Sequence, residues 1–236
     1  MHRTGRVCLT ILGCVLSLCS LKSQEIVTTA EPVGRTPSGI MTPVNQIVTP
    51  MGQQVDLPGM RPQALALSPD GKLLITTGKT SQLVVIDPET STIIDRVSLP
   101  ADNVSPANKP EDQGETDRFD NKGQVSFTGL IFSPDGHRIY LSNVNGSIKV
   151  FGVIDGKVKP LYSIPLPAAH APMRKNEIPS GLALSADGAK LFVCGNLSNR
   201  LLEVDTQTGK LTRSWDVGVA PYDVVVSSGK AYVSNW

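Results

Sequence analysis

FTGLIFSPDGHRIYLSN, residues 127–143, is an apolar run, a four-residue turn, a second apolar run and a small polar stop. In the turn, the Asp side chain accepts hydrogen bonds from nearby backbone and the Gly adopts positive φ without steric cost, so the stretch predicts a tight β-hairpin. Three further stretches follow the same pattern: QALALSPDGKLLITTG (63–78), SGLALSADGAKLFVCG (180–195) and YDVVVSSGKAYVSN (222–235).

The four hairpins belong to a longer repeat. Their turns lie 65, 52 and 42 residues apart, and each of the first three hairpins is followed by a second pair of short strands. The first strand of each of these three units is apolar on both faces and begins with a small residue, Ala64, Gly129 or Gly181. A strand buried on both sides and crowded at one end fits the innermost position of a propeller blade. We therefore predict an all-β fold, a β-propeller of four-stranded antiparallel blades.

The tetrads that end the hairpins carry a family resemblance. They are ITTG, YLSN, FVCG and YVSN, at residues 75–78, 140–143, 192–195 and 232–235. These tetrads resemble the signature of the YVTN-repeat, YncE-like β-propellers, over roughly residues 44–236. Gly78 and Gly195 depart from that signature, which has Asn at this position. More narrowly, residues 42–71 and 221–236 resemble the N-terminal propeller of bacterial exported proteins in which a propeller precedes a phosphoesterase domain.

The repeat predicts how the chain is organised. Because TPMGQQVDLPGM aligns with the outermost strand of the third unit, residues 53–57 are expected to be a closing strand that latches the last blade. Seven blades are usual in the family that the chain resembles, so we expect an incomplete arc of about three and a half blades from a larger protein. The predicted segments are a flexible N-terminal stretch at 24–43, blades at about 61–100, 126–167 and 178–218, and a half blade at 220–236.

The N-terminus has the layout of a secretory signal peptide. Two arginines precede the apolar stretch 7–21, and small residues follow it, which predicts a signal at 1–23 with cleavage before Gln24. A lipoprotein signal through Cys14 is the less favoured alternative. The mature protein is expected to be exported, periplasmic or extracellular, without a membrane span.

Removal of this signal changes both charge and cysteine content. It leaves 19 basic against 21 acidic residues, which argues against nucleic acid as the main partner. It also leaves Cys194 as the single cysteine, in the run KLFVCG, where a buried core residue is favoured over a reactive thiol.

The connections between blades indicate a binding face. In a propeller these connections emerge at the same end of the sheets, and the two longest insertions, 101–125 and 168–178, are both of this kind. Loops on a rigid scaffold are where binding residues concentrate. The first insertion carries six acidic residues, for which a solvated, mobile loop is favoured over a cation site.

Two residues on this face have side chains that could take part in catalysis, but each also has a simpler explanation. His170 is the one histidine on the face and is favoured as a solvated loop residue; Asp223 is favoured as a hydrated carboxylate near the channel mouth. The predicted ligand-face residues are Arg61, Lys79, Asn143, His170, Asn196, Arg200 and Asp223. No catalytic, metal-ligating or cofactor-binding residue is predicted, because haem, phosphate-loop and nucleophile-elbow motifs are missing from the sequence.

Two functions remain open at this point. The first is an exported binding or scaffold module that contacts a ligand, a partner protein or its own downstream domain. Any phosphoesterase activity implied by the resemblance would then reside in downstream residues, so this segment is not expected to be an enzyme. The alternative is a lactonase-type propeller hydrolase with its active site at the channel mouth.

Overall fold

The computed structural model describes residues 33–37, 39–44, 46–104, 106 and 117–236. The predicted signal peptide lies outside the described residues, and so does most of the acidic part of the first insertion. Every regular element of the described residues is a β-strand. The chain divides into two compact units, 1–52 and 53–236, each of which is described by itself.

The N-terminal unit contains a small antiparallel sheet. Its strands are β1 (Gly34–Thr36), β2 (Gly39–Met41) and β3 (Ile47–Val48), in the order β1-β2-β3. β1 and β2 lie within the stretch predicted to be flexible, 24–43, and β3 lies just after it; none of the three strands is predicted from the sequence. Strands of two or three residues are too short to show the alternation of apolar and polar residues by which a strand is recognised.

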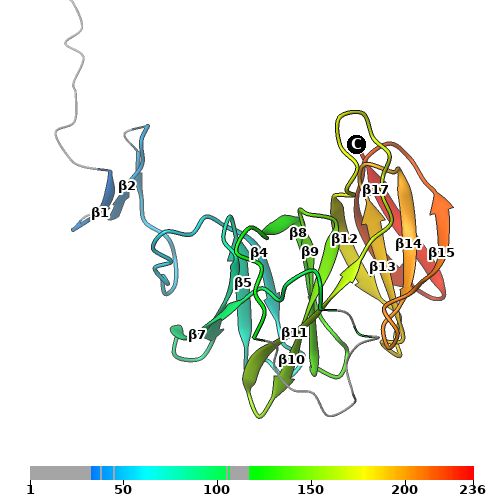
Figure 1. The fold of residues 1–236 in the computed structure, drawn as a ribbon. Coiled ribbons are helices and arrows are strands. Elements are labelled where there is room, and N and C mark those ends of the chain that lie inside the picture. Colours follow the sequence, from blue (N-terminus) through cyan, green and yellow to red (C-terminus); the bar gives the residue numbers. More distant parts are fainter. Residues whose placement is uncertain (1–32, 38, 45, 105, 107–116) are drawn as a thin grey trace, which may run out of the picture. The chain divides into compact units, whose positions relative to one another are not determined.

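The C-terminal unit is a succession of antiparallel sheets (Figure 1). The first sheet consists of β4 (Pro62–Leu67), β5 (Leu74–Gly78), β6 (Gln82–Asp87) and β7 (Thr92–Ser98). The second consists of β8 (Val125–Phe132), β9 (Arg138–Asn143), β10 (Ser147–Ile154) and β11 (Lys157–Pro165). The third consists of β12 (Pro179–Leu184), β13 (Lys190–Gly195), β14 (Arg200–Asp205) and β15 (Leu211–Asp216). A two-stranded sheet of β16 (Pro221–Ser227) and β17 (Lys230–Asn235) follows. The predicted class, all-β with four-stranded antiparallel blades, is confirmed.

Neighbouring blades meet through their first strands. β4, β8, β12 and β16 lie next to one another in that order. Side-chain hydroxyls also join neighbouring blades: Ser142 Oγ of β9 donates to the carbonyl of Ser180 at 2.7 Å, and Ser180 Oγ donates to the carbonyl of Pro221 at 2.7 Å. The acceptor carbonyls of Ser180 and Pro221 lie at the bulged starts of β12 and β16.

The small residues at the start of the first strands are explained by this proximity. A Cβ on Gly129 would overlap the carbonyl oxygen of Ser180 in the next blade. A Cβ on Gly181 would come within 2.5 Å of the Cα of Asp223. Real Cβ atoms do not approach other heavy atoms so closely, so glycine is required at both positions.

The hydrophobic core lies between the faces of successive sheets. In β10, Phe151 packs in the cluster shared with the first sheet, whereas its neighbour Val150 packs in the cluster shared with the third. Successive side chains of a strand point to opposite faces, and both of these are fully buried. The continuous apolar run in this strand therefore reflects burial on both sides.

The Asp-Gly turns form as their sequence predicts. Ser133 Oγ donates to Asp135 Oδ1 at 2.5 Å, the His137 N–H donates to the same oxygen at 3.0 Å, and Gly136 has a φ of 75°. The hydrogen bond from the serine hydroxyl and that from the backbone hold the pKa of Asp135 below its ordinary value.

The segment 53–57, predicted as a closing strand, forms no strand among the described residues. A strand is defined by hydrogen bonds to a neighbour, and no strand pairs with this segment here.

We predict that Gly129→Ala lowers the free energy of unfolding by about 2–3 kcal/mol, because the added methyl group is forced into the next blade. Gly71→Ala is the matched control: its φ is 74° but the position faces open space, so only the left-handed conformation is penalised, by about 1 kcal/mol. Urea unfolding followed by circular dichroism measures both. Equal losses would show that the approach of the first strands is not the constraint.

Candidate functional site

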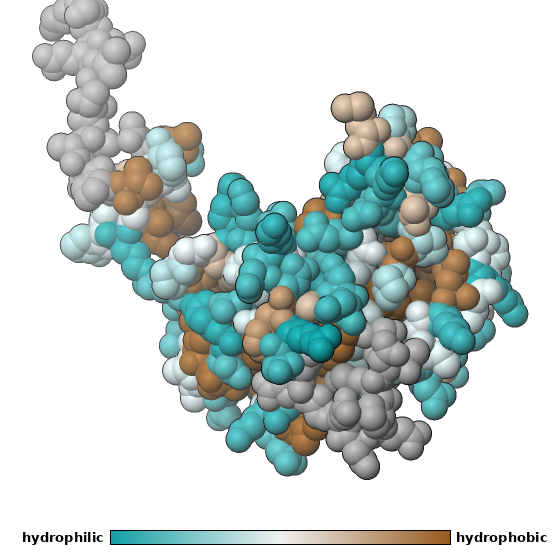
Figure 2. Space-filling model, viewed as in Figure 1, coloured by the Kyte–Doolittle hydropathy of each residue, from teal (hydrophilic) through white to brown (hydrophobic). Residues whose placement is uncertain are grey.

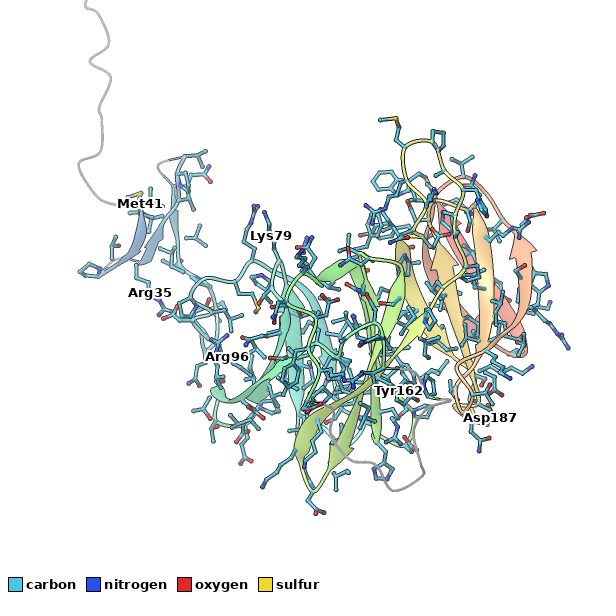
Figure 3. All side chains as sticks on the ribbon, in the orientation of Figure 1. Arg35, Met41, Lys79, Arg96, Tyr162 and Asp187 are labelled. Carbon is cyan, nitrogen blue, oxygen red and sulfur yellow. The ribbon has the colours of Figure 1, made fainter. Side chains whose placement is uncertain are left out.

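The candidate site lies at the end of the sheets where the connections between blades emerge. Figure 3 shows Lys79 at this end and Asp187, in a β-hairpin turn, at the opposite end. The connection 166–178 projects at the same end as Lys79, and it is coloured yellow in Figure 1. In the space-filling view the surface along this edge is mostly hydrophilic (Figure 2).

The structure brings four of the predicted ligand-face residues into two pairs. Arg61 and Lys79 are adjacent and exposed, since the Lys79 N–H donates to the Arg61 carbonyl at 3.4 Å. Asn196 donates through its side-chain amide to the Pro221 carbonyl at 3.2 Å, next to the exposed Asp223. The first pair belongs to the first blade and the second to the junction between β12–β15 and β16–β17.

Two other predicted residues are engaged within the protein. Asn143 is fully buried; its Oδ1 accepts from the Gln124 N–H at 3.2 Å and its Nδ2 donates to Ser147 Oγ at 3.0 Å. Arg200 pairs with Asp216 across the outer strands at 3.0 Å. Asn143 therefore ties the segment entering its blade to the sheet and is not accessible to a ligand.

His170 lies at the tip of the connection 166–178. This connection folds back on itself, because the Ala169 N–H donates to the Lys175 carbonyl at 2.9 Å. At its tip His170 and Met173 have φ values of 55° and 65°, and Met173 is fully exposed. Positive φ at residues other than glycine costs energy and recurs at functional sites.

Three aromatic side chains form a row, two of them on first strands and the third directly after β17. The ring centroids of Phe127 and Tyr222 are 5.5 Å apart and those of Tyr222 and Trp236 are 5.8 Å apart, both in edge-to-face geometry. Phe127 and Tyr222 belong to β8 and β16, with β12 between those strands. We call Phe127, Tyr222 and Trp236 the aromatic row. Trp236 is 81% exposed, so the row offers aromatic surface to solvent.

A bulge in β8 places Phe127 in this row. Val125 pairs with Asn143, and the next pair is Leu130 with Leu141, so β8 advances by five residues while β9 advances by two. At the corresponding place in the third sheet, β12 advances by three residues while β13 advances by two. Phe127 sits within the extra residues with a φ of 51°. The repeat in the sequence does not reveal this residue, because the units match at their turns and a difference in length at the far end of the strand stays hidden. The backbone strain at a bulky residue marks the position as a functional candidate.

A buried lysine anchors the first insertion. Lys149 of β10 is fully buried, and its ammonium lies 2.7 Å from Asp102 Oδ1, 2.9 Å from Asp120 Oδ2 and 2.8 Å from the Pro100 carbonyl. Ser147 Oγ also donates to Asp102 Oδ1 at 2.5 Å. Two acids of this insertion are thus partners of a buried ammonium, and a third, Asp117, is exposed. The acidic residues Glu111, Asp112 and Glu115 lie outside the described residues.

The ionisation of Asp120 is coupled to this contact. Burial raises the pKa of this carboxyl, but the adjacent Lys149 ammonium and the N–H groups of Lys122 and Gly123 lower it by more, so its pKa lies below the ordinary value of 3.8. The signal that could have revealed the anchor is a single lysine at an inward position of an apolar strand.

A buried glutamate anchors the second insertion. Glu177 is 1% exposed, and its Oε1 accepts from the N–H groups of Ile178 and Leu197, both at 2.9 Å. A Cβ on Gly195 would lie 2.9 Å from Glu177 Oε2, so the glycine that departs from the tetrad signature makes room for this carboxylate. In the second blade, Asn143 of the tetrad bonds to the segment that precedes the first strand. In the third blade the direction is reversed, because Glu177 of the preceding segment contacts the tetrad at Gly195.

Cys194 is fully buried, as predicted, and burial raises the pKa of its thiol to about 12. Within the described ranges, no group of three or more His, Cys, Asp or Glu side chains is arranged to hold a metal ion. In the same ranges, no helix has the length and apolar character needed to cross a membrane.

The fold is shared with known propellers. No protein-family model matches the sequence, and no curated protein matches it. Among solved structures, the β-propeller domain of Cps50 (Swd1) from Myceliophteria thermophila matches with a TM-score of 0.54 at 12% identity, over 78% of this chain and 52% of that one. Hydrazine synthase from Kuenenia stuttgartiensis matches with a TM-score of 0.52 at 19% identity, over 77% of this chain and 43% of that one. A functionally unknown protein from Desulfotomaculum acetoxidans matches with a TM-score of 0.53 at 16% identity, over 74% and 49%.

These similarities define a β-propeller fold and nothing finer, because the identities are low. The chain spans about half or less of the length of each of these structures.

We predict that Lys149→Met destabilises the protein by about 3 kcal/mol, because it leaves the mostly buried carboxylate of Asp120 and the exposed carboxylate of Asp102 without their cation. Adding Asp102→Asn and Asp120→Asn should recover part of the loss, as expected for coupled groups. Denaturant unfolding gives both values. Lys157→Met, at an exposed position, is the control; a loss no larger than the control's would refute the anchor.

We further predict an acid-dependent contribution from Asp120. Its pKa is lower in the folded than in the unfolded chain, so its stabilisation is complete above about pH 4 and is lost as the pH falls through the folded-state pKa. Between about pH 5 and pH 2, stability should therefore fall less in Asp120→Asn than in the parent protein. Unfolding midpoints at these pH values measure the difference, and identical slopes would contradict it.

Proposed function

We propose that this chain is an exported β-propeller binding or scaffold module. Its ligand or partner contacts the end of the sheets that carries the aromatic row, Asp223 and the connection 166–178. The observation that supports this most is Phe127, a bulky residue held at positive φ within a bulge that is longer in β8 than in the other first strands. Strain of this kind persists where the surrounding structure maintains it, and it is common at ligand-contacting positions.

The chemistry of the face suits a ligand with both apolar and polar parts. The aromatic row supplies apolar surface, and Asp223, Asn196, Arg61 and Lys79 supply charge and hydrogen-bonding groups. Aromatic side chains with a polar rim are typical of binding surfaces, because they bury a large area with few rotatable bonds.

We also propose membership of the YVTN-repeat, YncE-like propellers, and a place at the N-terminal side of a phosphoesterase domain. The tetrads and the Asp-Gly turns support the first proposal. The second rests on the resemblance of residues 42–71 and 221–236, and the catalytic residues would then lie downstream of this segment.

The lactonase-type alternative receives less support. Asp223 Oδ1 accepts a hydrogen bond from the Val224 N–H at 2.9 Å, and among the described residues no hydrogen bond or ion pair joins Asp223 to His170. A hydrolase site needs a set of converging polar groups, and these two side chains do not form one.

Tryptophan fluorescence tests the binding face directly. The chain has two tryptophans, so in Trp215→Phe the emission comes from Trp236 alone. We expect at least one ligand in a panel of organic cations, sugars and dipeptides to change this emission. Phe127→Ser in the same background should abolish the change.

The reciprocal variant is the control. In Trp236→Phe the emission comes from Trp215, which packs beside Phe192 away from the aromatic row, and it should not respond. A response that is confined to Trp215, or that persists in Phe127→Ser, would place binding elsewhere and contradict the proposed face.

Export is tested separately. Expressed with residues 1–23 in a bacterial host, the protein should appear in the periplasm or medium with Gln24 at its N-terminus, as read by mass spectrometry. An intact N-terminus in the cytoplasmic fraction would refute export, and a lipid-modified Cys14 would establish the lipoprotein alternative.

A further inference from the structure

A concave surface lies at the end of the sheets opposite to the candidate site. It is a groove of about 650 Å³ formed by three hairpin turns: that between β4 and β5, that between β8 and β9, and that between β10 and β11. β10 and β11 have 8 and 9 residues, whereas β6 and β7 of the preceding blade have 6 and 7. The longer hairpin projects past the shorter blade, and the groove is the space beneath it. Its volume is in the range of sites that hold small ligands or peptide side chains.

The lining of the groove is apolar. Leu73 and Val153 line it at buried and half-buried positions, and Pro69 and Ile154 add exposed apolar surface. Ile154 is 56% exposed although it is a large aliphatic residue. An apolar side chain placed here would be partly shielded from water.

The rim of the groove is acidic. Asp70, Asp135 and Asp155 line it against one cation, Lys72, whose ammonium is 3.8 Å from Asp70 Oδ2. The remaining titratable group in the lining, His137, is exposed and lies in the turn between β8 and β9. Hydrogen bonds from serine hydroxyls and backbone N–H groups hold the pKa values of Asp70 and Asp135 below the ordinary value, so both are ionised at neutral pH. The rim therefore carries a net negative charge.

The combination of an apolar lining and an acidic rim favours some classes of ligand over others. Negative charge repels phosphate, which excludes nucleic acid. Asp70 and Asp135 each use Oδ1 within their own turns, and no metal-binding group of side chains occurs in the described part of the chain. A lysine or arginine side chain matches both the apolar lining and the acidic rim. Its methylene groups can be buried while its charged group stays near water and the carboxylates.

We propose that this groove binds a segment of a partner protein that carries an arginine or lysine next to an apolar residue. The apolar residue packs on Ile154 and Val153, and the cation lies among the three rim carboxylates. The groove and the aromatic row lie at opposite ends of the sheets, so binding at the groove can be tested independently of the function proposed above.

Titration of ¹⁵N-labelled protein with the peptide acetyl-Leu-Arg-Leu-amide tests this proposal. We expect amide chemical shifts to move at Leu73 and at residues 153–156, and the matched peptide acetyl-Leu-Glu-Leu-amide to leave them unchanged. The affinity for the arginine peptide should fall with added salt, because the attraction is between charges near the surface.

Two variants report on the two parts of the groove. Asp155→Asn removes a rim charge at a turn position with a φ of 49°, which asparagine accepts, and should weaken peptide binding about threefold or more. Ile154→Ser should weaken it to a similar extent by removing apolar contact. Both residues are exposed, so the fold should be unaffected.

The matched control is Glu89→Gln, which removes one carboxylate from the exposed turn between β6 and β7, outside the groove. It should bind the arginine peptide as the parent does. The proposal is overturned if about 1 mM arginine peptide moves no groove resonance, if the glutamate peptide binds equally, or if Asp155→Asn and Glu89→Gln have the same effect.

Discussion

The structure depends on how closely the first strands of successive blades approach one another. Gly129 and Gly181 lie against the backbone of the next blade, and serine hydroxyls bond to carbonyl groups across the gap. In each antiparallel four-stranded blade, the connections between blades and the turn between the second and third strands lie at one end, and the other two hairpin turns lie at the opposite end. The aromatic row lies at the first of these ends, and the groove lies at the second.

Buried charges complete the scaffold at the end where the connections emerge. Lys149 and Glu177 have opposite charge and different partners, yet each holds the root of one insertion against a blade. Burying a charge is costly unless it is paired or hydrogen-bonded, and both side chains meet that condition. The insertions can therefore vary in length beyond their roots without loosening the sheets to which they are attached.

The parts of the fold that could be predicted from sequence are those determined locally. The Asp-Gly turns carry their own hydrogen bonds, and Gly129 and Gly181 recur at one position of the repeat, so hairpins and inner strands could be recognised. Lys149 and Asp102 are 47 positions apart, and nothing in the repeat indicates that they pair. Asn143 was predicted to face a ligand because its place in the repeat is near the correct end; burial and its two internal hydrogen bonds make it structural.

The bulge in β8 shows how residues can be inserted into one blade without disturbing the others. Its additional residues are absorbed before the hydrogen-bonded ladder begins again at Leu130, so the rest of the blade keeps its register. Each first strand begins beside the shared axis of the blades. Residues inserted there change the side chains near the axis and leave the packing of the core unchanged. Evolution, or a protein engineer, can thus diversify recognition by adding backbone at one blade while its neighbours continue to stack unchanged.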